Sequence, residues 1–304
     1  MPAQRKGSIH LFRFAGIDVF LHWSWFLVAL FEVQARNRNY SSPLWNLAEY
    51  LSLFVIVLLH EFGHSLACRQ VGGTANTIVL WPLGGVAFVD PPQRPGATLW
   101  SIAAGPLVNV ALVPVLYLAA TTVRAFQWAP AAADFPMLFR SLFAINLLIL
   151  AFNLLPIYPL DGGQILRSLL WFFLGRARSL MVAAFFGLVV LVAALGLALW
   201  SWSLWYAIMA YFLLANCWRG LQTARMMLEI AKLPRRQGFA CPSCHAAPPY
   251  GDFWRCPHCG QPFDPFSAES RCHCMTGIVT ASCLLCGARH PVGDWVLAPA
   301  ETTA

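Results

Sequence analysis

Residues 55–73 read VIVLLHEFGHSLACRQVGG, an apolar run interrupted by two histidines and one glutamate. His60 and His64 are four positions apart, so on a helix they lie on one face and can bind one metal ion together. Glu61 is then placed to take a proton from a water held by that metal. The alternative is that neighbouring helices satisfy these polar side chains without a metal. Because unpaired polar groups are costly in an apolar helix, the pattern favours a zinc site with Glu61 as its general base.

The composition places this helix in a membrane. Of 304 residues, 59% are hydrophobic and 11% are charged, whereas soluble domains carry roughly a quarter charged residues. A helix needs about 20 apolar residues to cross a bilayer. Six stretches meet that length, namely 17–34, 47–70, 99–123, 138–158, 179–200 and 203–224. We therefore expect an all-α polytopic membrane core of about six transmembrane helices, surrounded by membrane lipid.

The Lys and Arg residues indicate the orientation of these spans. With the N-terminus inside, only Arg36, Arg38, Arg124 and Arg140 flank the outer ends. The inner ends carry the larger set, Arg5, Lys6, Arg13, Arg69, Arg94, Arg167, Arg176, Arg178, Arg219, Arg225, Lys232, Arg235 and Arg236. We expect a multi-pass protein of the cell (inner) membrane with both termini cytoplasmic. The first residues show no cleavage site for a signal peptide. Because the basic residues follow topology and form no single patch, no nucleic-acid partner is expected.

The segment between the second and third spans departs from the helical pattern. Residues 74–92 read TANTIVLWPLGGVAFVDPP, a β-branched run followed by Pro82, Gly84 and Gly85 and a second apolar run. This predicts a short β-hairpin or re-entrant loop on the inner side. From about residue 234 the composition becomes polar. We divide the chain into a membrane core, residues 1–233, and a cytoplasmic region, residues 234–304.

Two further polar residues in apolar surroundings are candidates for the site. Asp161, in NLLPIYPLDGGQ (153–164), emerges at the inner side, as His60 and His64 do, and is the best candidate for a third zinc ligand. The alternative is that Asp161 caps the following helix. Asn109, in AAGPLVNVAL (103–112), is an amide that can bond a substrate backbone or a carbonyl oxygen that gains charge. Its alternative is a hydrogen bond between helices.

Together these segments resemble the site-2 protease family of intramembrane zinc metalloproteases. The matching pieces are HEFGH at 60–64, PLGG at 82–85, GPLVN at 105–109 and NLLPIYPLDGG at 153–163. The opening GIDVFLHWSWF (16–26) is similar to the first span of bacterial and archaeal members. The resemblance covers about residues 10–225. No insert like a PDZ domain and no nucleotide-binding module is visible.

The resemblance implies roles for particular residues. Zinc would be bound by His60, His64 and Asp161, with Glu61 as general base and Asn109 near the substrate carbonyl. The hairpin around 77–89 would offer its edge to an extended substrate strand. The implied function is a zinc metalloendopeptidase that cuts membrane-protein substrates in or near their transmembrane segments, as in regulated intramembrane proteolysis.

The polar C-terminal region contains eight of the ten cysteines. We group them in chain order into two four-thiolate sites, Cys241, Cys244, Cys256 and Cys259, then Cys272, Cys274, Cys283 and Cys286. Each set suits a closed, structural zinc site in a reducing compartment. His245, His258 and His273 are substitute ligands. We therefore expect each set to form a zinc ribbon, which gives one catalytic and two structural zinc ions in all, with the ribbons available to a cytoplasmic partner.

Three other functions compete with proteolysis. A catalytically silent scaffold that recruits partners through its ribbons would not need Glu61. A metal transporter would need acidic or His residues along several spans, and the first, third, fifth and sixth offer almost none. A different class of membrane metalloprotease would differ in the third ligand. The sequence leaves the substrate, the cut position and the oligomeric state open.

Overall fold

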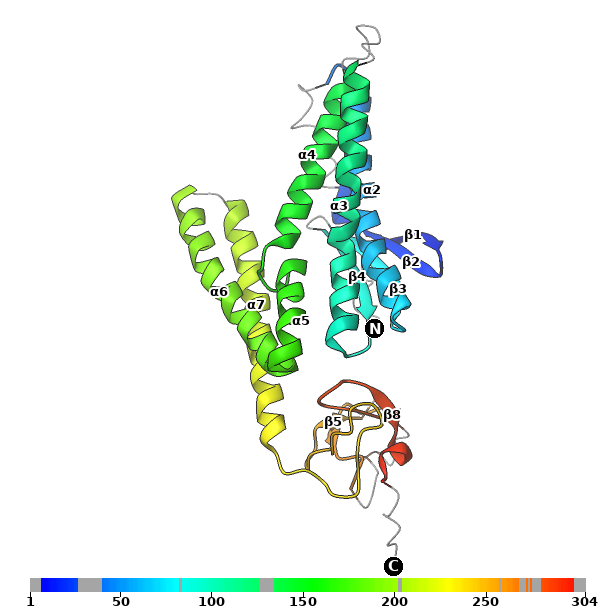
Figure 1. Ribbon diagram of the computed structural model, residues 1–304, viewed down its shortest axis with the longest axis vertical. Helices are drawn as coiled ribbons and strands as arrows, with labels where there is room; N and C mark the ends of the chain where they lie inside the picture. The colour runs from blue at the N-terminus through cyan, green and yellow to red at the C-terminus, as the bar shows by residue number, and fades with distance from the viewer. Residues whose placement is uncertain are drawn as a thin grey trace, which may run out of the picture.

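The computed structural model describes residues 7–26, 40–81, 84–125, 134–201, 204–256, 258–267, 272, 274 and 280–297. Within these ranges the chain forms two groups of long helices, a four-stranded sheet beside the first group, and a small Cys-rich region below them (Figure 1).

The first group contains α2 (Pro43–Gln70), α3 (Pro95–Ala125) and α4 (Asp134–Leu154), packed in chain order (Figure 1). Helix α2 begins with Pro43 after Ser42, whose hydroxyl accepts a hydrogen bond from the Leu44 N–H. Gly63 lets α2 and α3 approach closely, because a Cβ there would lie 2.7 Å from the Ala104 carbonyl oxygen. The histidines of α2 are thereby brought against α3.

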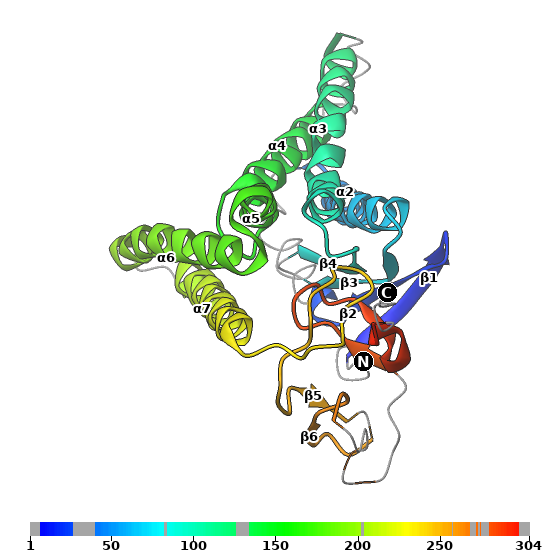
Figure 2. The ribbon, with the colours of Figure 1, turned by 60° about the horizontal axis from the view of Figure 1, so that its bottom comes forward.

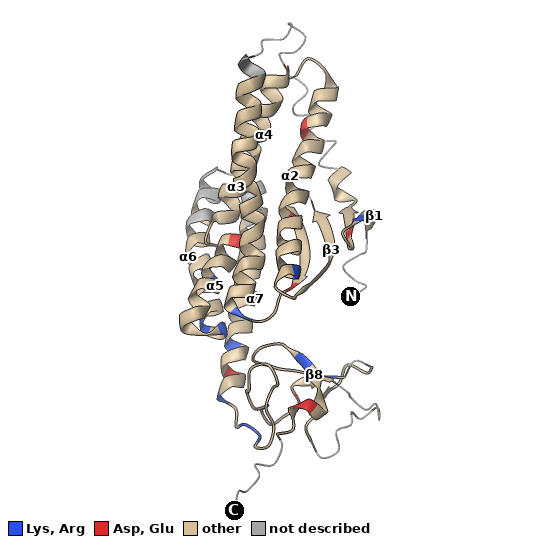
Figure 3. Ribbon diagram, turned by 45° about the vertical axis from the view of Figure 1, so that its right-hand side comes forward, with Lys and Arg blue, Asp and Glu red and all other residues tan. Residues whose placement is uncertain are grey.

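The second group contains α5 (Asp161–Leu174), α6 (Arg176–Ser201) and α7 (Leu204–Lys232). Gly175, with φ 76°, makes the turn between α5 and α6. Helices α6 and α7 form an antiparallel pair (Figure 1). Figure 3 shows that charged residues are sparse along the long helices and that basic ones gather at the end of α5–α7 nearest the Cys-rich region. This distribution fits helices embedded in a bilayer.

The sheet has the order β1 (Ser8–Phe14), β2 (Ile17–His22), β3 (Thr74–Trp81), β4 (Gly84–Asp90). Strands β2 and β3 are parallel, and the other two pairs are antiparallel. Apolar side chains of β2 and β3 pack on one face of α2. Strand β4 is an edge strand and has its second edge free within this sheet. The expected hairpin over 74–92 is therefore confirmed, with Pro82 and Leu83 outside the described residues.

Four described segments are long and apolar enough to cross a membrane, namely Pro43–Gln70, Pro95–Thr122, Asp134–Leu154 and Asp161–Val192. The expected helical membrane core with a hairpin and a Cys-rich end is confirmed. The first expected span, 17–34, is wrong over 17–22, because these residues pair with β3 as strand β2. Residues 27–34 lie outside the described residues. The helix that follows Asp161 is the short α5, which was not among the expected spans and ends before the helix that contains residues 179–200.

The Cys-rich region contains two small antiparallel pairs and a single turn of 3-10 helix. The pairs are β5 (Trp254–Arg255) with β6 (Pro262–Phe263) and β7 (Thr280–Ser282) with β8 (Arg289–Pro291), followed by the turn Val292–Trp295. Trp254, Phe263, Phe266 and Trp295 form an apolar core together with the buried Cys241, Cys256, Cys272 and Cys283. Figure 2 shows this region beneath the sheet and the helices.

Candidate metal centre

His60, His64 and Asp161 bring three ligand atoms together from α2 and the start of α5. His60 Nε2 lies 3.1 Å from His64 Nε2 and 3.1 Å from Asp161 Oδ2, and His64 Nε2 lies 3.4 Å from that oxygen. A tetrahedral zinc ion with bonds of about 2.0–2.1 Å holds its ligand atoms roughly 3.3 Å apart. The triangle therefore has the size that zinc requires, and three protein ligands are the number that a catalytic zinc uses.

Asp161 is positioned by the irregular segment before α5. Gly162 and Gly163 sit so close to the preceding turn that a Cβ would lie 2.3 Å from the Leu154 carbonyl oxygen at the first and 2.4 Å from Ile157 at the second. The N-cap of α5 is Leu160, which has no side-chain cap hydrogen bond. Asp161 is thus the first residue of α5 rather than its cap, and its carboxylate reaches the histidines.

An amide pair fixes the tautomer of His60. The Asn146 Nδ2 group donates to the Asn109 backbone carbonyl at 3.0 Å, and a carbonyl can only accept. Asn146 Oδ1 must then accept from Asn109 Nδ2, at 2.8 Å. This turns Asn109 Oδ1 toward His60 Nδ1, at 2.5 Å, so that His60 carries its proton on Nδ1. Its Nε2 atom faces the other ligand atoms.

His64 is held in the same way by the backbone of α3. Its Nδ1 atom lies 2.9 Å from the Ser101 carbonyl oxygen and donates a proton to it. His60 and His64 can therefore both present Nε2 lone pairs to the Asp161 carboxylate. Three converging acceptors require a positive charge between them, and a divalent cation supplies it.

Gly105 of α3 supplies a second test of the fit to a metal. A Cβ at this position would lie 2.3 Å from His64 Nε2 and 2.8 Å from His60 Nε2. A side chain would therefore enter the space between the two imidazoles. Because residue 105 is glycine, the space beside the ligand atoms stays open, as a bound zinc ion requires.

Glu61 lies against the sheet and interacts electrostatically with His60, His64 and Asp161. It is 5% exposed, and its Oε2 atom accepts a hydrogen bond of 2.9 Å from the Ala87 N–H of β4. Strand β4 passes directly over it, because a Cβ at Gly85 would lie 2.2 Å from Glu61 Cγ. Ala87 pairs with Ile78 of β3 but sends its N–H away from β3, so the free edge of β4 borders Glu61.

Asn109 lies at the site, as expected for a residue near the reaction centre. Its side chain is fully buried and bonded to His60 and Asn146. The bonds between Asn109 and Asn146 of α4 also bear out the alternative of a contact between helices. Asn146 was not among the predicted site residues. A signal existed, because it is a second amide within an apolar stretch.

We expect Asn146→Leu to weaken zinc binding at this centre by about 10- to 100-fold, the usual effect of losing a partner that orients a metal ligand. Without Asn146, the Asn109 amide is free to rotate and no longer fixes the His60 tautomer. The measurement is zinc retention by the full chain during titration with a chelator. Asn216→Leu is the control, because among the described residues Asn216 bonds only the Phe212 carbonyl of its own helix. Equal retention by both variants would contradict this role.

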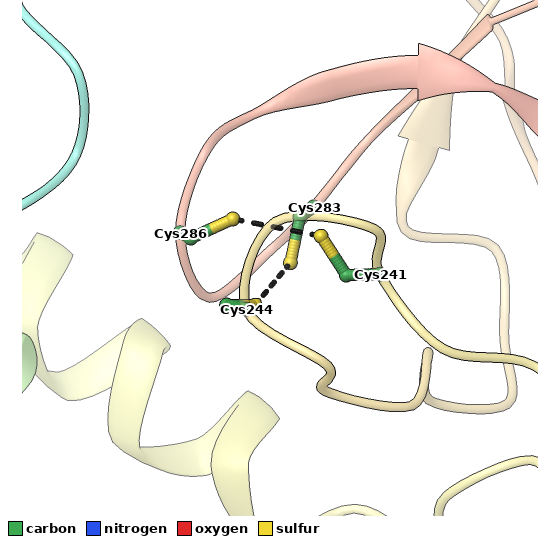
Figure 4. A group of neighbouring side chains, drawn as sticks. All are labelled: Cys241, Cys244, Cys283 and Cys286. Carbon is green, nitrogen blue, oxygen red and sulfur yellow. Dashed lines mark hydrogen bonds between the residues drawn. The ribbon is translucent and has the colours of Figure 1, made fainter. Parts of the chain in front are cut away.

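The eight C-terminal cysteines form two clusters, but not in chain order. Cys241 and Cys244 join Cys283 and Cys286 (Figure 4), and Cys256 and Cys259 join Cys272 and Cys274. We call these the outer site and the inner site. Sulfur pairs lie 3.3–3.7 Å apart, against roughly 3.8 Å for tetrahedral zinc with bonds of about 2.3 Å. The expected grouping in chain order was wrong. The last cysteine pair, which lies between β7 and β8, folds back onto the first pair, and the two middle pairs form the inner site.

Three of the four cysteine pairs share one backbone turn. In each, the first cysteine's N–H donates to the carbonyl five residues on, and its carbonyl accepts from the N–H four residues on. The donors are Cys241, His245, Cys256, Gly260, Cys283 and Gly287, with distances of 2.8–3.0 Å. The fifth position has positive φ in all three, at His245, Gly260 and Gly287. Such turns point both thiols to one side, as a shared metal requires.

The histidines proposed as substitute ligands are not members of these clusters. Four sulfurs complete each site among the described residues. His245 occupies the left-handed turn position, His258 is exposed, and His273 lies outside the described residues. Burial raises the pKa of the Cys286 thiol above its ordinary value, and hydrogen bonding with Cys244 raises it further. Metal loading of the outer site must therefore release protons.

Comparisons with known proteins extend these observations. Residues 48–129 and 120–197 match the model of Peptidase family M50. The chain is 36% identical over 183 residues to a zinc metalloprotease of Methanocaldococcus jannaschii, covering 59% of this chain and 50% of that protein. It is 34% identical over 118 residues to stage IV sporulation protein FB of Bacillus subtilis, covering 38% of each. The chain thus spans half the length, or less, of these two curated relatives.

A solved structure also resembles this chain. The site-2 protease from Methanocaldococcus jannaschii matches with a TM-score of 0.51 and 29% sequence identity. The match covers 70% of this chain and 95% of that chain.

Proposed function

This chain belongs to peptidase family M50, the family of the site-2 proteases, and from this premise we propose that it is a zinc-dependent membrane endopeptidase. It hydrolyses peptide bonds in or next to transmembrane segments of membrane-protein substrates, as in regulated intramembrane proteolysis. One observation carries the proposal. Glu61 lies beside three converging ligand atoms and at the free edge of strand β4.

The residues around the triangle have separate tasks. His60, His64 and Asp161 hold zinc, which supplies Lewis acidity that lowers the pKa of a water toward 7 and polarises a carbonyl. Glu61 takes the proton of the attacking water and passes it to the leaving amide nitrogen. The Ala87 N–H donates to Glu61 Oε2, so Glu61 Oε1 remains available to accept the proton of the attacking water.

The free edge of β4 receives the substrate. A transmembrane helix has its carbonyls bonded within the helix, so it must unwind before water can attack. An unwound segment laid along β4 would satisfy its backbone groups and run past Glu61. The proposal therefore assigns substrate recognition to main-chain pairing with β4, which tolerates many sequences.

Ala87→Pro is expected to lower cleavage about tenfold, the effect of one lost backbone hydrogen bond in a dry site. Proline removes the N–H on the free edge but no ladder bond to β3. Ala87→Gly is the control, because it keeps the N–H. Cleavage of a single-span reporter measures both. An equal loss in the two variants would contradict a role for the N–H group.

The Cys-rich region is proposed to bind two structural zinc ions, one at each cluster. This region is too small for a robust apolar core of its own, so metal stabilises its fold. We assign residues 1–233 to the membrane core and residues 234–304 to the cytoplasm. The basic end of α5–α7 next to the Cys-rich region supports cytoplasmic termini in a cell membrane.

The test is a cleavage assay with the full chain in lipid vesicles. Single-span reporters with different transmembrane segments are incubated with the zinc-loaded chain, and the new termini are identified by mass spectrometry. The proposal predicts cuts within or next to the cytoplasmic half of the span. Cuts confined to soluble loops, or cleavage that persists in His60→Ala, would favour a different protease. A chain that binds the reporters but cuts none would favour the scaffold.

A further inference from the structure

The outer site lies directly against the membrane core. Arg176, the first residue of α6, donates from Nη1 to the Leu285 carbonyl at 2.7 Å. Leu285 lies between Cys283 and Cys286, within the turn that grips the metal. A Cβ at Gly287 would lie 3.3 Å from Gln93 Cγ and 3.6 Å from Arg176 Nη1. One metal-binding turn therefore bonds the core at Arg176 and lies close to Gln93.

The Cys-rich region is also fixed where it leaves α7. Arg235 donates to the carbonyls of Ile230 and Ala231 at the end of α7, at 3.2 and 3.4 Å. The same guanidinium donates to the Ala247 carbonyl of the Cys-rich region at 3.0 Å. With α7 as one attachment and the outer site as the other, the region spans the base of the core, as Figure 1 shows.

Arg176 and Gln93 are each connected to a proposed catalytic residue, the first through α5 and the second through β4. Arg176 follows Gly175 at the end of α5, and α5 begins with Asp161. Gln93 lies in the short connection after β4, and β4 bonds Glu61 through Ala87. A 14-residue helix is a rigid rod of about 20 Å. A restraint on its far end therefore limits the movement of Asp161 relative to β4.

We propose that the outer four-cysteine site is a metal-dependent strap, which fastens the end of α5 to the connection after β4 and so holds Asp161 and β4 in register. The strap itself rests on the contacts above, whereas its effect on cleavage rests on the proposed function. When metal leaves, Cys283 and Cys286 lose the ligand bonds that join their turn to Cys241 and Cys244, so the Leu285 carbonyl is no longer held in place against Arg176. The inner site makes no such contact among the described residues.

The contact is tested in the full chain with the photo-crosslinker p-benzoylphenylalanine in place of Gln93. With zinc bound, it should crosslink to the segment 280–297. Arg176→Met should lower the yield about tenfold, the effect of losing one charge-assisted hydrogen bond. Arg178→Met is the matched control, because Arg178 is exposed on the same helix and should leave the yield unchanged.

A second pair of variants separates the two metal sites. Cys283→Ser with Cys286→Ser should abolish the crosslink, whereas Cys256→Ser with Cys259→Ser should retain it. An unchanged yield in Arg176→Met, or equal loss in both cysteine variants, would overturn the strap.

Cleavage of a reporter tests the consequence for the active site. Arg176→Met should cut several-fold more slowly than Arg178→Met while both hold three zinc ions. Equal rates despite a lost crosslink would overturn the link to the site. If wild-type cleavage proves independent of Glu61, the proposed function fails, but the crosslinks still decide whether the strap exists.

Discussion

Replacing Glu61 by Gln is expected to abolish peptide cleavage while leaving zinc bound. Glutamine has the same size as glutamate and still accepts the Ala87 hydrogen bond, so the packing beneath β4 is kept. It cannot take a proton from water. Loss of a general base lowers the reaction rate by about 10²–10⁴-fold. The cleavage that remains in the variant should therefore be too slow to detect. The ligand triangle does not include Glu61, so the metal stays.

The measurement is cleavage of a single-span reporter together with zinc content. Glu229→Gln is a suitable control, since Glu229 is exposed on α7 and, in the part of the chain that the structure describes, pairs only with Lys232. Cleavage by Glu61→Gln at the wild-type rate would refute general-base catalysis. Loss of zinc in that variant would mean that Glu61 holds the metal instead.

Gly105→Ala is expected to remove zinc from the catalytic centre and with it all cleavage. The added methyl group would stand 2.3 Å from His64 Nε2, inside the space that a metal ion needs. Helix α3 itself should not suffer, because Ala favours helix over Gly by about 1 kcal/mol. The zinc content of the full chain should fall from three ions to two.

The matched control is Gly96→Ala in the first turn of α3. A Cβ there meets only the end of Phe172, at 3.9 Å, so zinc content and cleavage should match the wild type. If Gly105→Ala retains three zinc ions, the metal does not lie between His60 and His64.

The centre of the site could be predicted from sequence because its chemistry is local. His60, Glu61 and His64 fall within one helical turn, and apolar neighbours make polar side chains conspicuous. Asp161 could be added because topology places it at the same side of the membrane. The structure brings these residues together as expected, and the hairpin over 74–92 forms where its Pro and Gly residues indicated.

Other features depend on pairings that sequence does not encode locally. Residues 17–22 are apolar enough for a span, but they pair with β3, which lies far along the chain. The cysteine pairs have nearly identical spacing, so nothing local distinguishes a nested grouping from a sequential one. The role of Asn109 depends on Asn146, an amide from another helix. Each miss concerns a partner chosen by tertiary packing.

A zinc centre at His60, His64 and Asp161 is tested most directly by the number of zinc ions per chain, measured by elemental analysis of the full chain and of His60→Ala. We predict three ions in the wild type and two in the variant, because only the catalytic centre loses a ligand. Two ions in both proteins, under metal-replete conditions and with the fold intact, would contradict a zinc centre at His60, His64 and Asp161.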